Sequence, residues 1–264
     1  MLKLNEEFVN AIIKFGADKG YTFTNTEERF QTLNYVVTDS DKCEFETKNG
    51  ELQSITLDSN GLCMPFVDDD NNITDRVVIV SKEHQNDPLY VVHELLHFFS
   101  TNMDEEKGLI SGVDNFGISD GVVAINEGLT DYFTYKISGN YFNKKDLDLG
   151  CGDKEFHNYH YLILLINLLT YEDKELEDKI FNAYMNNDTE CIYTKLQNAF
   201  GLNRNAIEYL FERAEYYLDD QLDEIDKEIF LEDIEKVVNF YYNNVYSKKC
   251  EDPNFVDNYL KLFK

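Results

Sequence analysis

The sequence has no tryptophan, only three prolines, and less than half as many basic as acidic residues. With 24 Lys and Arg against 51 Asp and Glu, the formal net charge is −27. Such a charge argues against electrostatic binding of nucleic acid or of an anionic membrane. If the substrate is charged, we expect it to be basic.

Long hydrophobic runs and paired cysteines are also missing. The most apolar stretch, residues 161–169, is too short to span a bilayer and includes Asn167. The first seven residues carry acid where a signal peptide needs a basic and then an apolar segment. The five cysteines show no CxxC spacing, so neither a disulfide framework nor a cysteine-bound zinc is expected. These absences predict a cytoplasmic protein, and leaderless export stays open as the alternative. The sequence does not indicate an oligomeric state.

The hydrophobic pattern predicts an α+β fold, in which residues 1–82 form a small N-terminal portion. An amphipathic helix starts near Phe8 and ends near Gly16 or Gly20, and residues 27–37 fit either a helix or a strand. Short alternating runs follow, separated by Asn49-Gly50 and Asn60-Gly61. Asn-Gly is typical of hairpin turns, so two or three antiparallel strands are expected. The acidic run 68–72 lacks the spacing of a calcium loop and is interpreted as a polar turn.

Residues 83–264 form the second predicted domain, and the pattern there is mostly helical. The glycine-rich stretch from Thr101 to Asp120 is expected to be a loop at the rim or lid of a cleft. The apolar periodicity predicts helices over residues 156–170, 174–185, 189–200, 205–225 and 230–245, with a short one after Pro253. The helix at 205–225 is expected to bury a stripe that ends in Ile225.

The stretch His93-Glu94-x-x-His97 places two histidines on one face of a helix, where both imidazoles can bind one metal ion. This HExxH arrangement is typical of zinc sites in which the glutamate is the general base. Asp87 is a suitable N-cap, Pro88 fits the first helical turn, and the positions around the histidines are apolar. The sequence therefore predicts a buried helix with a metal site, with satisfied core histidines as the alternative.

A second helix, expected from about Ser119 to Ser138, supplies a third candidate ligand. Its core stripe runs from Val122 to Ile137, and Glu127 and Asp131 lie together on the opposite face. Two carboxylates at this spacing repel each other unless a cation or a histidine N–H lies between them. A solvated acidic face is the alternative. Gly139 is the expected end of this helix.

Residues 117–121 match the serine-nucleophile pattern GxSxG. That pattern marks a nucleophile only where a strand turns sharply into a helix, and no apolar strand precedes it here. Ser119 or Asp120 is therefore expected to be the N-cap of the helix that carries Glu127.

Together, His93-Glu94-x-x-His97 and Asn126-Glu127-Gly128-Leu129-Thr130-Asp131 resemble the signature of the gluzincin metallopeptidases, the thermolysin-like group. The resemblance implies a zincin-like catalytic region with a zinc ion bound by His93, His97 and Glu127, and with Glu94 as the base. It also implies that Asp131 accepts a hydrogen bond from the ring N–H of His93 and that Asn126 supports the site. The likeness covers about residues 77–137, and the interval from His97 to Glu127 is longer than that of thermolysin, which suggests a divergent branch.

Thermolysin-like enzymes use a downstream histidine or tyrosine to stabilise the oxyanion, and Tyr159 and His160 are the candidates here. The sequence thus predicts a zinc-dependent hydrolase that cleaves peptide bonds of a peptide or protein substrate with a metal-activated water. Two alternatives stay open. One is a zinc-bearing, peptidase-like protein that acts as a binding or regulatory module without turnover. The other is a helical interaction protein in which the motifs are accidental.

Overall fold

The computed structural model describes residues 4–57, 60–115, 119–142, 159–218, 222–248 and 252–263. The α+β class is confirmed, because a small N-terminal sheet precedes a mostly helical region. The chain divides into two compact units. One comprises Met1–Phe116, Phe133–Asp146 and Met185–Asn187, and the other comprises Gly117–Tyr132, Leu147–Tyr184 and Asp188–Lys264. The domain boundary expected at residue 82 stays a prediction.

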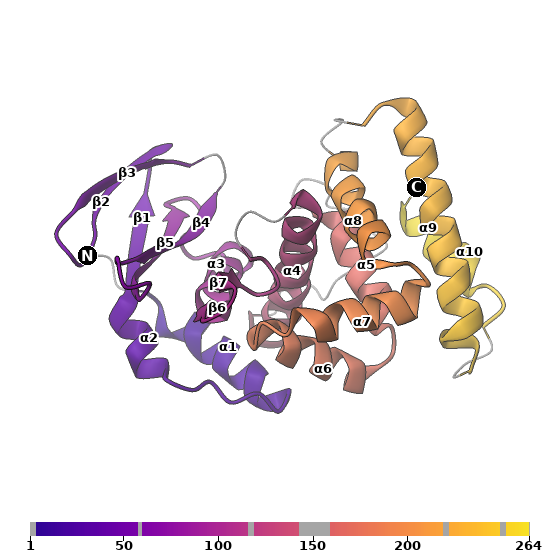
Figure 1. Ribbon diagram of the computed structural model, residues 1–264, viewed down its shortest axis with the longest axis horizontal. Coiled ribbons are helices and arrows are strands. Elements are labelled where there is room, and N and C mark those ends of the chain that lie inside the picture. The colour runs from indigo at the N-terminus through magenta and orange to yellow at the C-terminus, as the bar shows by residue number, and fades with distance from the viewer. Residues whose placement is uncertain are drawn as a thin grey trace. The chain divides into compact units, whose positions relative to one another are not determined.

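A three-stranded sheet in the order β1-β5-β4 lies in the first unit (Figure 1). The central strand β5 (Ile73–Ser81) pairs in parallel with β1 (Leu33–Thr38) and antiparallel with β4 (Gly61–Val67). Residues 77–80 of β5 are fully buried, as expected for a strand that is covered on both faces. The sequence of residues 76–80 alone favours a strand, because it is a short run rich in valine and isoleucine, and this run lies within β5.

A hairpin of β2 (Lys42–Glu46) and β3 (Leu52–Thr56) covers one face of this sheet. Its turn contains Asn49-Gly50, as predicted, and Gly50 has a φ of 81°, which favours glycine. Cys43 and Phe45 of the hairpin are buried against Val77 and Ile79 of β5. By strand alternation, Val78 and Val80 face the other side of the sheet.

The prediction of a hairpin turn at Asn60-Gly61 is wrong. Gly61 opens β4, whose partner is β5 and not β3. The chain turns instead between β4 and β5, at residues 68–72, where Asp68 accepts a hydrogen bond of 2.8 Å from the backbone N–H of Asn72. The side chain of Asp68 thereby stabilises the turn between β4 and β5.

Three helices belong to the first unit: α1 (Glu6–Asp18), α2 (Thr26–Thr32) and α3 (Pro88–Ser100). Helix α1 is the predicted amphipathic helix, and the ambiguous residues 27–37 form both α2 and β1. Helix α3 packs against α1 and against β4 and β5 (Figure 1).

The expectation of a loop over Thr101 to Asp120 is wrong for its first part. Strands β6 (Thr101–Asp104) and β7 (Gly108–Ser111) form an antiparallel hairpin directly after α3. Gly108 lies in its turn with a φ of 79°, so the glycine that suggested a loop serves a tight turn. Residues 116–118, which include part of the GxSxG match, lie outside the described residues.

Helix α4 (Asp120–Phe142) contributes its first part to the second unit and its last part to the first. The expected end at Gly139 is wrong, because the helix continues for three more residues. The extension is held by contacts within the first unit: the Tyr141 hydroxyl donates to Asp18 at 2.9 Å, and the Phe142 ring centroid lies 5.2 Å from that of Phe8. These contacts outweigh the cost of about 1 kcal/mol for a glycine inside a helix.

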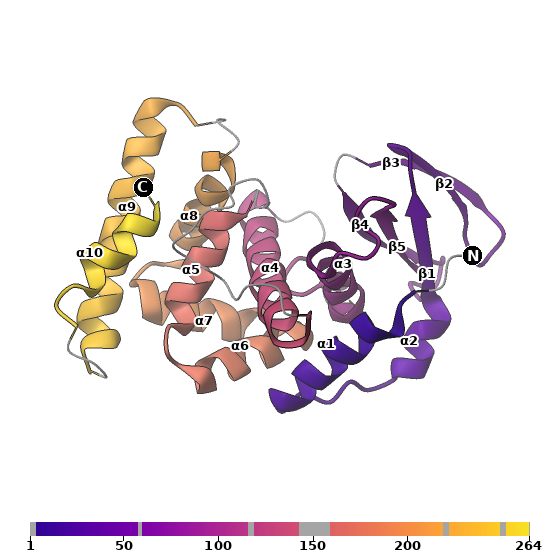
Figure 2. The same cartoon turned by 180° about the vertical axis from the view of Figure 1, so that it is seen from behind.

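The second unit is helical, and its most buried element is α5 (His160–Thr170), which contacts α7 and α8 (Figure 2). The other helices are α6 (Lys174–Met185), α7 (Thr189–Phe200), α8 (Arg204–Leu218), α9 (Glu224–Asn244) and α10 (Phe255–Leu260). The bounds predicted for α6 and α7 are confirmed. Residues 156–158, where α5 was expected to begin, lie outside the described residues.

The prediction of one helix over residues 205–225 is wrong. Helix α8 ends at Leu218, and α9 begins at Glu224 after an N-cap in which Asp223 accepts from the N–H of Asp226. Ile225, which was expected to be in the core, is 68% exposed. Among the described helices, none is long and apolar enough to cross a membrane.

Candidate metal centre

The HExxH helix begins as the sequence predicts. The side chain of Asp87 accepts a hydrogen bond of 3.1 Å from the N–H of Leu89, and Pro88 occupies the first turn. From Val91 to Ser100 every residue is buried except His93 and His97, which are half-buried. Between Val91 and Ser100, the two histidine side chains are therefore the ones that solvent or a ligand can reach.

The imidazoles of His93 and His97 point their Nε2 atoms at each other, at a distance of 3.1 Å. Tetrahedral zinc with Zn–N bonds near 2.0–2.1 Å places two nitrogen ligands about 3.3 Å apart. The spacing of the two Nε2 atoms thus fits a shared cation as well as it fits a shared proton.

Glu127 of α4 completes a group of three ligand residues. One ligand atom from each of His93, His97 and Glu127 lies within 4.8 Å of the other two. All three side chains are half-buried, so they combine partial access with partial exclusion of water. Two imidazole nitrogens and one carboxylate oxygen form a donor set that binds divalent metals, zinc among them. This His-His-Glu group could hold a metal ion.

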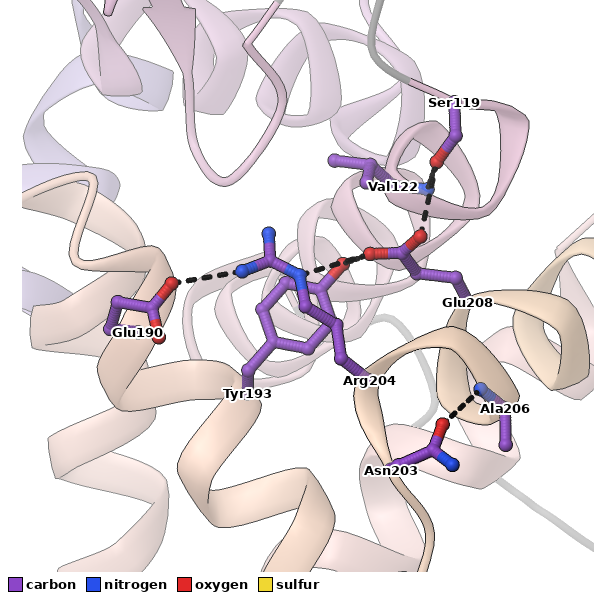
Figure 3. A network of polar contacts seen from close by, with 8 residues as sticks. All are labelled: Ser119, Val122, Glu190, Tyr193, Asn203, Arg204, Ala206 and Glu208. Atoms are coloured by element: carbon purple, nitrogen blue, oxygen red, sulfur yellow. Dashed lines mark hydrogen bonds and ion pairs between the residues drawn. The ribbon is translucent and has the colours of Figure 1, made fainter. Parts of the chain in front are cut away.

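The start of α4 is anchored to α8 by a polar network around Glu208 (Figure 3). The Ser119 hydroxyl lies 3.4 Å from the N–H of Val122, which fits the predicted N-cap, and 3.4 Å from a carboxylate oxygen of Glu208. The other oxygen of Glu208 accepts from the Tyr193 hydroxyl at 2.7 Å and from Arg204 at 3.1 Å. Ser119 therefore caps the helix within a structural network, as the sequence predicts.

Arg204 joins Glu208 to the exposed Glu190, and its guanidinium carbon lies 4.0 Å from the centroid of the Tyr193 ring (Figure 3). Burial, together with the hydrogen bond to Glu208, raises the pKa of Tyr193, so the phenol stays a donor at neutral pH.

Two glycines let α4 approach its neighbours within the second unit. A Cβ built on Gly121 would lie 2.5 Å from the backbone oxygen of Glu208 in α8. A Cβ built on Gly128 would lie 2.9 Å from the Cβ of Leu162 in α5. Gly128 directly follows Glu127, so the close approach of α5 limits the sideways movement of the helix at the ligand.

Glu94, the predicted base, is 8% exposed and lies against the first residue of β4. A Cβ built on Gly61 would lie 2.5 Å from its Oε1 atom. Burial raises the pKa of the thiol of Cys63, two residues along the strand, and the negative charge of Glu94 adds to this effect. The carboxylate therefore occupies a narrow space beside β4.

The structure places the remaining predicted residues on the expected elements. Asn126 is 3% exposed, and its carbonyl accepts from the Thr130 hydroxyl at 2.8 Å. Asp131 is half-buried, one turn after Glu127, and its hydrogen bond to the ring of His93 stays a prediction. Tyr159 is the N-cap of α5 and His160 its first residue, so both immediately precede the segment that approaches Gly128. Their role at an oxyanion also stays a prediction.

Sequence reasoning missed the polar groups that hold the end of α3. The Asn187 side chain donates at 2.8 Å to the carbonyls of both Ser100 and Gly112. Arg29 and Arg76 both donate to the carbonyl of Thr101, the C-cap, which supports the negative end of the helix. These residues are distant in sequence, and no local motif connects them with α3.

Comparisons of this chain with models of known protein families, with curated proteins and with solved structures found no match. The functional interpretation therefore depends on the geometry of the site itself.

Proposed function

We propose that this protein is a zinc-dependent hydrolase that cleaves peptide bonds, as its resemblance to the gluzincins suggests. The observation that carries the proposal is the convergence of ligand atoms from His93, His97 and Glu127 to within 4.8 Å, with Glu94 next to the first of them in sequence. The alternative interpretation, that the histidines are satisfied core residues, would account for a single buried imidazole. It does not account for a carboxylate from another helix close to two facing Nε2 atoms.

In this proposal each protein residue has a defined task. His93, His97 and Glu127 would hold the ion, which when bound would lower the pKa of a water molecule and polarise the scissile carbonyl. The Glu94 carboxylate accepts the proton of the attacking water and passes it to the leaving amine. Tyr159 or His160 donates a hydrogen bond to the oxyanion, and Asp131 orients the imidazole of His93.

The net negative charge of the protein favours a basic peptide or protein substrate, since the sequence has 51 acidic and only 24 basic residues. The same excess of negative charge disfavours nucleic acid as a substrate or partner. Cys43, Cys63 and Cys191 are free thiols, which supports a reducing, cytoplasmic compartment.

The proposal is tested with the Glu94→Gln variant, which keeps the size of the side chain but removes its basicity. We expect one zinc ion per chain, an unchanged melting temperature and a fall in peptide hydrolysis of about 10²–10⁴-fold. Turnover is measured on a mixed peptide library, with a chelator-treated sample and a zinc-restored sample as controls. Undiminished cleavage by the variant would exclude the role of Glu94.

The wild-type protein distinguishes the proposal from its alternatives. Zinc bound at one ion per chain without turnover of any peptide would indicate a binding or regulatory module. Absence of bound zinc after purification and after addition of the metal would indicate that the two motifs are accidental.

A further inference from the structure

Gly61, the first residue of β4, lies directly against the side chain of Glu94. A Cβ at position 61 would lie 2.5 Å from Oε1, 2.8 Å from Cγ and 3.0 Å from Cδ of Glu94. Ordinary contacts between such atoms are about 3.5 Å or longer. Any side chain at position 61 therefore requires the end of Glu94 to move by about 1 Å.

The backbone at Gly61 does not itself require glycine. Its φ is not in the left-handed region, and it pairs with Val80 of β5 in regular antiparallel register. Glycine weakens a strand, because it adds backbone entropy to the unfolded chain and packs no side chain. What does call for glycine at position 61 is the side chain of Glu94, which occupies the space that a Cβ would need.

We propose that Gly61 is a positioning residue for the general base: the missing side chain provides the space in which the Glu94 carboxylate is held beside β4. This inference rests on the proposed function for its catalytic meaning, but the contact itself is independent of it. Glu94 is 8% exposed, so few other positions are open to its side chain.

The first test is a crystal structure of the zinc-bound Gly61→Ala variant. We expect an unchanged sheet and one zinc ion per chain, with the Glu94 carboxylate moved by about 1 Å from its wild-type place. A variant in which the carboxylate keeps its place, or in which β4 moves instead, would overturn the inference. This result does not depend on any enzymatic activity.

The second test measures turnover. A displacement of 1 Å in a reacting group can cost about 10²-fold, so we expect Gly61→Ala to lower kcat by about that factor with a smaller change in KM. The control is Val67→Ile, which also adds one carbon to β4, at a side chain that is 45% exposed. It should keep the wild-type kcat.

A rescue separates positioning from a general loss of structure. Aspartate at position 94 is shorter by one methylene group, so its carboxylate clears a Cβ at position 61. We expect Glu94→Asp to impair the wild type but to cost nothing further, or to restore turnover, in the Gly61→Ala background. Additive losses in the double variant would overturn the inference. If the wild-type protein hydrolyses no peptide, the proposed function fails, and the crystal structure still decides the contact.

Discussion

At the scale of single residues, the candidate site depends on three side chains that together offer metal ligands. His93, His97 and Glu127 are each half-buried, and their two imidazoles and one carboxylate form a donor set that could hold a divalent cation. Binding of such a cation would be coupled to folding, because the unfolded chain has no preformed site.

This coupling leads to a prediction about metal affinity. His93→Ala removes a ligand and should weaken zinc binding by more than about 100-fold, the upper range for loss of a merely supporting partner. Glu127→Gln should also weaken it, because the amide carries no charge. His84→Ala is the control, since the His84 ring stacks on Tyr90 at 3.9 Å and belongs to no group of potential metal ligands among the described residues. Competition with a chelating dye measures all three, and wild-type affinity in His93→Ala would contradict the assignment.

The histidine pair of the candidate site could be predicted from the sequence, because helical spacing alone brings His93 beside His97, as it brings Glu127 beside Asp131. The supporting residues could not. Gly61 contacts Glu94 because α3 packs against β4, and Asn187 reaches the end of α3 across 87 positions of sequence. The periodicity of apolar residues along the sequence does not indicate contacts between residues so far apart.

At the scale of elements, the position of α4 depends on its capping network. Glu208 is hydrogen bonded to Ser119, Tyr193 and Arg204, and its side chain is 21% exposed. Glu190 pairs with the same arginine, but its side chain is 77% exposed. The two glutamates therefore form a matched pair for measuring what this network contributes.

We expect Glu208→Ala to lower the free energy of unfolding by about 2 kcal/mol, because it leaves the buried hydroxyl of Tyr193 without its charged acceptor. Glu190→Ala should change it by no more than about 0.5 kcal/mol, as is usual for an exposed ion pair. Urea unfolding measures both. Equal effects of the two substitutions would show that Glu208 does not anchor the helix.

Element boundaries show where sequence reasoning succeeds and fails. The starts of α6 and α7 could be predicted because Asp173 and Asp188 accept hydrogen bonds from the first turns of these helices, and Gly201 ends α7 in the left-handed conformation. The end of α4 is set by the contacts of Tyr141 and Phe142 with α1, which the sequence around Gly139 does not reveal. The break between α8 and α9 was missed because an apolar residue, Ile225, continued the helical period while being exposed.

At the scale of the whole molecule, the 18 tyrosines make stability sensitive to high pH. Burial raises the pKa of Tyr35 and of Tyr161 to about 12, and it raises the pKa of Tyr259 further. An unfolded tyrosine loses its proton near pH 10. Between about pH 10 and 12 the folded state therefore binds more protons than the unfolded state, so the free energy of unfolding falls as pH rises.

Titration of the near-ultraviolet absorbance of tyrosinate measures this effect. We expect one group of tyrosines to ionise near pH 10 and the buried group to ionise only as the protein unfolds. In concentrated guanidinium chloride all of them should ionise together near pH 10. A single reversible step near pH 10 in the folded protein would contradict the burial of these phenols.

The tie from Asn187 to Ser100 and Gly112 has a consequence for the order of events at the ribosome. Translation proceeds from the N-terminus, so the segment bearing the imidazoles leaves the exit tunnel long before the amide that secures its end. Helices α4, α5 and α6 are made in between. A nascent chain arrested ahead of residue 187 should thus remain sensitive to proteases at the end of α3, and a chain arrested well beyond this residue should be protected there.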